Sequence, residues 1–309
     1  MNIFFGLPIL IGIVLGLISP YYALELNQYT IYILALMSVL SLSRINFETF
    51  KVVPKNRAPH LAAVFVHYLI VPSLVWLVAH FLFENESLQL GFFWASLSPT
   101  ALFVPTLITK NIQSKDYEIA IQFLILSMIL MPPIAWLMSF LFFGQALSLN
   151  LKTYAIDLFL VTTAPIAIVL LLTKVKLFKK AMMAINLKTI HVLNLLLVGL
   201  LSYIFLGTAL LKLNFRTLSF AEQGTIVLFS LGFDFLIYFG VPFFLRRLVD
   251  KEYFQSLRTC ISVRNVAIGG SMLLFYRPQS VLSIVGIFIS HWIFISSYHF
   301  LIERKQNFL

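Results

Sequence analysis

A positively charged side chain stands in the middle of a strongly apolar stretch of this sequence. Arg264 is followed by Asn265, and Gly269 and Gly270 come about one helical turn later. A charge in the hydrocarbon core of a membrane costs about 3 kcal/mol or more unless it faces a polar cavity or a partner. Asparagine and glycine also weaken a helix at this depth. A charge beside a breakable helix is typical of a transport site.

A second apolar stretch carries its own helix breakers. Pro99 and Pro105 each remove a backbone hydrogen bond and clash with the preceding turn. Pro105 lies 160 residues before Asn265, about half of the chain. Two interrupted helices at matching positions predict a site where they meet, whereas two kinked structural helices are the alternative. Small polar residues that can line this site, or serve as ordinary helix contacts, are Ser98, Thr100, Thr106, Thr259, Ser262 and Asn265.

Other titratable side chains lie inside apolar stretches. Asp234 is the only acid well inside one, and we expect Arg264 or Arg258 to pair with it because an unpaired carboxylate there is costly. Alternatively, Asp234 is a proton-coupling group whose protonation releases the arginine. His67 can titrate near neutral pH, and His291 is a weaker candidate of the same kind. A neutral, hydrogen-bonded interior histidine is the alternative for both.

Arg264 admits three interpretations. Its guanidinium group can bind an anionic substrate, since its fork of donors suits carboxylate or phosphate. It can be a built-in cation that holds the crossing helices together. It can extend to the membrane surface, although its midspan depth disfavours this. The first two roles are compatible with each other.

The composition predicts an all-α polytopic membrane protein. Of the 309 residues, 60% are hydrophobic and 11% are charged, whereas a soluble domain has roughly a quarter charged residues. A membrane-spanning helix needs about 20 apolar residues. Ten stretches meet this approximately, at 3–20, 29–48, 59–83, 88–109, 117–143, 155–174, 188–211, 223–245, 252–276 and 279–302.

The basic residues predict the orientation. Alternate loops carry sixteen and four lysines and arginines, and Arg258 and Arg264 complete the 22. The richer loops are expected in the cytoplasm, with both termini, in the plasma (inner) membrane. The net charge of +10 is therefore explained without nucleic acid as a partner. The lipid bilayer is the partner that the composition predicts.

Several kinds of site are disfavoured. Cys260 is the single cysteine, which rules out an internal disulfide and a multi-cysteine metal site. No phosphate-binding loop of the form G-x-x-x-x-G-K-[ST] and no zinc motif His-Glu-x-x-His occurs. We therefore expect no cofactor and no enzymatic activity. An intramembrane enzyme is the weakest alternative, since only one aspartate lies deep.

The two halves of the chain look related. Five predicted spans fall in residues 1–143 and five in 155–303, all within one membrane domain, 1–309. An odd number of spans per half means that a second copy would be inverted in the membrane, which is a common transporter plan.

Five segments carry a resemblance to a known family. In order, they are Ile33–Phe47, Ala62–Pro72, Ser98–Asn111, Asp116–Gln122 and Arg258–Ile268. In order and spacing, the chain resembles the bile acid:sodium symporter superfamily over nearly its whole length. The resemblance implies ten helices in two inverted repeats, with a panel of spans 1, 2, 6 and 7. It also implies a core of spans 3, 4, 5, 8, 9 and 10, in which the fourth and ninth are unwound where they cross.

The sodium sites of that family are not preserved. Its Ser-Asn pair at the fourth-span break corresponds here to Val104 and Pro105. Its ninth-span glutamate corresponds to Cys260 and its glutamine to Arg264, while Asn265 matches. A third-span glutamine corresponds to His67. A fixed guanidinium opposes a cation, so the resemblance implies that the usual sodium sites are absent.

Together these features predict a secondary active transporter of a small organic anion. It would work by alternating access at the crossing of the fourth and ninth spans, with proton-linked or sodium-independent coupling. A sodium-coupled symporter that uses residual carbonyl ligands is one alternative, and a non-transporting sensor or scaffold is another. Arsenite carriers of the superfamily use a fourth-span cysteine, which this chain lacks.

Overall fold

The computed structural model shows a helical protein and describes most of the chain. The described residues are 7–42, 57–102, 104–108, 114–144, 151–172, 174–175, 178, 185, 187–212, 219–276 and 280–307. Much of the loop sequence whose charges predict the orientation, such as residues 43–56 and 109–113, lies outside these ranges. The orientation therefore stays a prediction.

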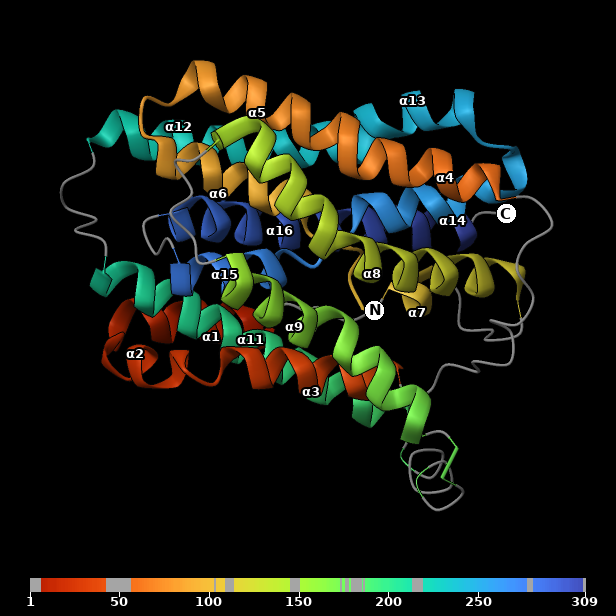
Figure 1. Ribbon diagram of the computed structural model, residues 1–309, viewed down its shortest axis with the longest axis horizontal. Coiled ribbons are helices and arrows are strands. Elements are labelled where there is room, and N and C mark those ends of the chain that lie inside the picture. Colours follow the sequence, from red (N-terminus) through yellow and green to blue (C-terminus); the bar gives the residue numbers. More distant parts are fainter. Residues whose placement is uncertain are drawn as a thin grey trace.

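Helices account for nearly all of the described residues (Figure 1). The helices of the first half are α1 (Leu7–Ile18), α2 (Tyr21–Asn27), α3 (Thr30–Leu42), α4 (Ala58–Phe65), α5 (Val71–Leu82), α6 (Glu86–Leu97), α7 (Val104–Ile108) and α8 (Lys115–Phe143). Those of the second half are α9 (Leu151–Leu172), α11 (Leu187–Lys212), α12 (Phe220–Phe235), α13 (Val241–Leu248), α14 (Lys251–Ser262), α15 (Val266–Tyr276) and α16 (Val281–Asn307).

The lengths and surfaces of these helices are those of a membrane-embedded protein. Within the described residues, four helices are long and apolar enough to cross a membrane: Ala58–Leu82, Lys115–Phe143, Val192–Lys212 and Phe220–Leu248. Large apolar side chains such as Phe81 and Phe243 are 78% and 60% exposed. Such exposure is unfavourable in water and is expected against lipid.

The chain bends sharply after the first predicted span. The axes of α1 and α2 differ in direction by 116° at the break between them. If these two helices are treated as a single bent span, they make a fifth candidate for crossing the membrane. Pro20 at this break cannot donate a backbone hydrogen bond. The predicted span 3–20 therefore corresponds to α1, and α2 forms where the sequence predicted a loop.

The helices form two groups (Figure 1). α1, α2, α3, α9 and α11 lie together, with α1 packed on α11 and α3 packed on α9. α1 and α11 touch through their backbones, because a Cβ atom added at Gly12 would lie 2.0 Å from the carbonyl oxygen of Gly199. The other helices form the second group, in which α15 and α16 contact helices of the first group.

The contacts between helices occur in corresponding pairs. α5 packs on α6 as α13 packs on α14, and α7 packs on α8 as α15 packs on α16. α6 packs on α16 as α14 packs on α8, and α1 packs on α11 as α9 packs on α3. Each of these elements of the first half therefore has a counterpart in the second half with equivalent neighbours.

Two long helices contain a matching irregularity. A π-helical segment, Val66–Ile70, joins α4 to α5, and another, Leu236–Gly240, joins α12 to α13. In each case a valine and a proline follow, Val71-Pro72 and Val241-Pro242. π-Helical turns are rare and are often found at functional sites.

Candidate functional site at the crossing of two interrupted helices

The fourth and ninth apolar stretches are both interrupted, as the sequence predicted. α6 ends at Leu97 and α7 begins at Val104, while α14 ends at Ser262 and α15 begins at Val266. Ser98 has an extended backbone with ψ of 139°, which is the conformation that a following proline favours. Pro99 therefore sets where the first interruption begins.

The two interruptions pair with each other as a short antiparallel bridge between Thr100 and Arg264. The Ala101 N–H donates to the Val263 carbonyl at 2.9 Å, and the Asn265 N–H donates to the Pro99 carbonyl at 2.7 Å. Backbone groups that a continuous helix would satisfy internally are thus satisfied between the two segments. This answers the need for every buried backbone group to find a partner.

Thr100 completes the end of α14. In a continuous helix the Arg264 N–H would donate to the Cys260 carbonyl. Here the Thr100 hydroxyl donates to that carbonyl at 2.9 Å. The Thr100 N–H donates in turn to the Ser127 hydroxyl of α8 at 3.2 Å. Thr100 is fully buried, so this side chain replaces a helical hydrogen bond in the protein interior.

The Arg264 guanidinium group is buried among backbone carbonyls. Nη1 donates to the Ser96 carbonyl, and Nη2 donates to the His67 carbonyl at 3.4 Å. Ser96 lies in the last turn of α6, where carbonyls lack helical partners and the helix dipole is negative. The arginine therefore joins α6, the third apolar stretch and the α14–α15 interruption.

The π-helical segment explains why the His67 carbonyl is free to accept. The Val71 N–H donates to the Val66 carbonyl, so the next residue would donate to His67. That residue is Pro72, which has no N–H. The His67 ring reaches the same region, because Nε2 donates to the Ser98 carbonyl at 3.0 Å.

The second half repeats this arrangement. The Val241 N–H donates to the Leu236 carbonyl, and Pro242 has no N–H to offer to Ile237. The Ser262 hydroxyl donates to the Ile237 carbonyl instead, at 3.2 Å. In both halves, the π-helical segment and the proline after it leave one backbone carbonyl without a helical donor. A side chain of the ninth stretch donates to each of them, Arg264 to His67 and Ser262 to Ile237.

Asp234 pairs with a histidine, not with an arginine. Its Oδ1 lies 2.7 Å from His291 Nδ1, and its Oδ2 accepts from the Ser290 hydroxyl. The expected direct ion pair with Arg264 or Arg258 is not found among the described residues, where His291 and Ser290 contact this carboxylate. The connection to Arg264 is indirect, since the Arg264 backbone N–H donates to His291 Nε2 at 3.1 Å.

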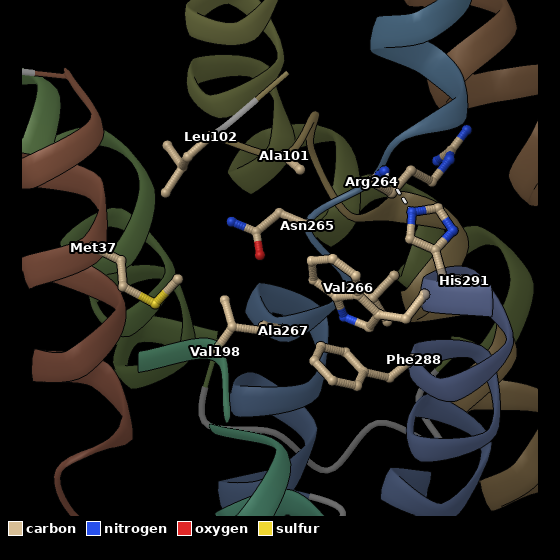
Figure 2. A pocket seen from close by; sticks show the side chains of 11 residues that line it. Met37, Ala101, Leu102, Val198, Arg264, Asn265, Val266, Ala267, Phe288 and His291 are labelled. Atoms are coloured by element: carbon tan, nitrogen blue, oxygen red, sulfur yellow. Dashed lines mark hydrogen bonds between the residues drawn. The ribbon is translucent and has the colours of Figure 1, made fainter. Parts of the chain in front are cut away.

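A small cavity of about 40 Å³ adjoins the crossing (Figure 2). It is lined by Met37, Ala101, Leu102, Val198, Arg264, Asn265, Val266, Ala267, Phe288, His291 and Trp292. Figure 2 shows the Asn265 amide pointing into the cavity and the Arg264 side chain pointing away from it. Met37 belongs to α3 and Val198 to α11, so the cavity lies between the two groups of helices.

The predicted site residues occupy different positions around this centre. Thr100, Arg264 and Asn265 form the crossing, and Ser98, Cys260 and Ser262 lie next to it. The His67 carbonyl accepts from Arg264, and Asp234 is connected to Arg264 through His291. Pro105 is buried at the start of α7. The side chain of Thr106 lies outside the described residues. Of these residues, Arg264 and Asn265 line the cavity.

Sequence reasoning missed most of the cavity lining. His291 ranked below His67, although its ring lies between Asp234 and the backbone of Arg264. Phe288 and Trp292 occupy the same helix, on either side of His291. A polar residue three positions after one aromatic residue and directly before another was the available signal, but it is also common in ordinary helix packing.

Comparisons with known proteins do not assign the chain to a family. A scan against protein-family models found no match, and a search of curated proteins found no significant relative.

Proposed function

We propose that this protein is a secondary active transporter of a small organic anion. The observation that carries the proposal is the backbone bridge between two interrupted helices beside a cavity. Interrupted helices within a membrane are tolerated where they are buried in protein or line a cavity. In transporters, such helix ends meet at the binding site.

The corresponding contacts support an inverted-repeat architecture. The paired neighbours of the two halves are those expected if ten spans form two copies of five that are related by a two-fold axis. The twin π-helical segments and the twin interruptions add to this support. In this proposal α1, α2, α3, α9 and α11 form the panel, and the remaining helices form the core.

The packing also favours one role for Arg264. Its guanidinium binds the carbonyls of Ser96 and His67 and points away from the cavity. A fixed cation that binds backbone carbonyls does what a sodium ion does in the symporter family that the sequence resembles. We therefore propose a resident positive charge in place of sodium, and transport that does not require sodium.

The location follows from the charge pattern of the loops. We propose a multi-pass protein of the plasma (inner) membrane with both termini in the cytoplasm. Modification of single cysteines placed in the loops of a Cys260→Ser background, in intact cells, tests this orientation. Labelling of the loop at 43–56 from outside the cell would contradict it.

Uptake into proteoliposomes tests the transport function. The purified protein is reconstituted and supplied with radiolabelled pyruvate, succinate or citrate, in sodium or choline buffer. We expect saturable uptake of at least one of these above that of empty liposomes, without ATP and equally in both buffers. Uptake that depends on sodium would contradict the resident-cation role of Arg264, and absence of uptake of all three anions would count against the proposed substrate class.

A matched pair of variants separates the crossing from the rest of the molecule. Asn265→Leu removes an amide that points into the cavity, whereas Asn85→Leu removes a helix cap that lies outside the site. We expect Asn265→Leu to lose uptake and Asn85→Leu to keep it. Equal uptake by both variants would indicate that the cavity at the crossing does not bind the substrate.

A further inference from the structure

We propose that His291 is the proton-binding site of this carrier, and that proton binding there exposes two N–H donors to an anion in the cavity. The proposal rests on the proposed transport function and adds a coupling ion and a place where the anion binds. It starts from the position of His291, which contacts Asp234 on one side and the crossing on the other.

The hydrogen bonds of His291 determine which ring nitrogen carries hydrogen. Nε2 accepts from the Arg264 backbone N–H at 3.1 Å, so Nε2 has no hydrogen of its own. Nδ1 lies 2.7 Å from Asp234 Oδ1 and therefore donates to the carboxylate. In this structure the ring is therefore neutral. The lone pair on Nε2 accepts the hydrogen bond from the Arg264 backbone N–H in the interruption between α14 and α15.

A proton that binds to His291 must take that lone pair. The Arg264 N–H and the new Nε2–H would then point at each other, and the hydrogen bond between them is lost. The imidazolium keeps its bond to Asp234 and forms an ion pair with it. Proton binding therefore breaks the hydrogen bond to the Arg264 backbone N–H without breaking the Asp234 contact.

The surroundings of His291 contain few other charges. The Arg264 guanidinium opposes a second positive charge, but it is directed toward Ser96 and His67. The Tyr238 ring lies 5.8 Å from the His291 ring between centroids, and Arg258 donates to the Tyr238 carbonyl at 3.4 Å. α6, α11 and α15 also pack against α16, and in the described part of the chain none of their charged side chains contacts His291.

The released donors belong to two residues that line the cavity. Arg264, Asn265 and His291 all line it (Figure 2). After protonation, Nε2–H and the Arg264 N–H no longer bind each other, and a carboxylate can accept from both through its two oxygens. The Asn265 amide provides a further donor nearby. The ligand class is therefore a small monocarboxylate that binds together with one proton.

The size of the cavity agrees with a site that is closed before the proton binds. At about 40 Å³ it is far smaller than the roughly 300–1,000 Å³ of common ligand sites. Loss of the bond from Arg264 to His291 removes one of the hydrogen bonds that hold the segment between α14 and α15, while its backbone bonds to Pro99 and Ala101 remain. Because one proton accompanies one negative charge, transport of a monocarboxylate should carry no net charge.

Proton uptake by the purified protein tests the site directly. Pyruvate is added to the protein in weakly buffered detergent solution with a pH indicator. We expect the wild type to take up as much as one proton per protein molecule on binding pyruvate. His291→Gln is the informative variant, because the amide oxygen of glutamine can accept from the Arg264 N–H and its NH₂ can donate to Asp234, but the amide binds no proton.

His291→Gln should fold and should show no proton uptake on addition of pyruvate. His80→Gln alters an exposed histidine of α5 and should behave like the wild type. Thermal unfolding of each variant checks that the fold is kept. If His291→Gln has a lowered unfolding temperature, Asp234→Asn provides the second test, since it removes the ion-pair partner of the protonated ring and should reduce proton uptake on addition of pyruvate. Proton uptake by either variant that equals that of the wild type at every pH would overturn the proposal.

Transport measurements distinguish failure of this site from failure of the proposed function. An inward proton gradient should accelerate pyruvate uptake by wild-type proteoliposomes several-fold, and a membrane potential should not. His291→Gln should lose the response to the proton gradient. A variant that keeps this response would overturn the role of His291 but leave the transport function intact. A wild type that transports none of pyruvate, succinate and citrate would instead count against the transport function.

Discussion

Arg264 donates to the carbonyl of His67 because Pro72, five residues after His67, has no N–H to occupy that carbonyl. The missing N–H of Pro72 thus leaves a backbone carbonyl in the third apolar stretch open to the guanidinium group of Arg264, which belongs to the ninth. The same guanidinium binds the Ser96 carbonyl at the end of α6. This one side chain therefore joins three segments that are distant in the sequence.

Replacement of Arg264 by alanine should make the protein responsive to an added cation. The free carbonyls of Ser96 and His67 would each cost about 1–3 kcal/mol, and relief from burying a charge would offset part of this. We expect a net loss of about 2 kcal/mol in the free energy of unfolding. Guanidinium ion at low concentration should raise the unfolding temperature of Arg264→Ala, because it can enter the vacated space.

The matched control for this experiment is Arg57→Ala, which removes an exposed arginine. Its unfolding temperature should be close to that of the wild type, and low guanidinium should not raise it. If low guanidinium lowers the unfolding temperatures of the wild type and Arg264→Ala alike, the carbonyls do not form a cation site.

Thr100 provides a test of the bridge that does not involve charge. Thr100→Val keeps the shape of the side chain but removes the hydroxyl that donates to the Cys260 carbonyl at 2.9 Å. The buried carbonyl would lose this donor, and we expect a loss of about 1–3 kcal/mol in the free energy of unfolding. Thr100→Ser keeps the hydroxyl and should lose less. The comparison is made by thermal or denaturant unfolding, and equal stability of Thr100→Val and the wild type would contradict the assigned bond.

Pro242 and Ser262 should be energetically coupled. The Ser262 hydroxyl binds the Ile237 carbonyl because Pro242 cannot. Ser262→Ala should cost about 1 kcal/mol in the wild-type background. In a Pro242→Ala background the restored N–H can serve Ile237, so the same change should cost less. A double-mutant cycle measures this coupling, and strictly additive effects would show that the proline is not the reason for the bond.

Glycine at position 269 permits close packing between α15 and the end of α6. A Cβ atom there would lie 2.7 Å from the Ser98 hydroxyl and 3.0 Å from the Trp94 carbonyl. We expect Gly269→Ala to lower the free energy of unfolding by about 1–3 kcal/mol, as overpacking does. Gly232→Ala in α12 meets nothing within 4 Å and should stabilise its helix by up to about 1 kcal/mol. The opposite signs are measurable by thermal unfolding under identical conditions.

The interruptions were predictable because proline and glycine act on the backbone of their own helix. Pro99 and the weak helix around Asn265 carry that information in the sequence itself. α2 was not predicted, because its seven residues are too few to register as a membrane span. The π-helical segments were not predicted either, although Val71-Pro72 and Val241-Pro242 mark both of them.

The partner of Asp234 was not predictable in the same way. Charge alone favoured Arg264 or Arg258, but His291 lies opposite Asp234 because of how α12 and α16 are rotated against each other. Hydrophobic periodicity gives the face of a helix that is buried and does not give the neighbouring helix. The cavity depends on the same information, since its residues come from α3, α11, α15, α16 and the two interruptions.

The backbone contact between Gly12 and Gly199 has a consequence for synthesis. α1 leaves the ribosome early, but Gly199, which Gly12 of α1 contacts, is synthesised 187 residues after Gly12. At about 5–20 residues per second this delay is roughly 10–40 s. During that time the apolar surface of α1 must be covered by lipid or by a chaperone, and its final neighbour arrives only when the second half of the chain is inserted.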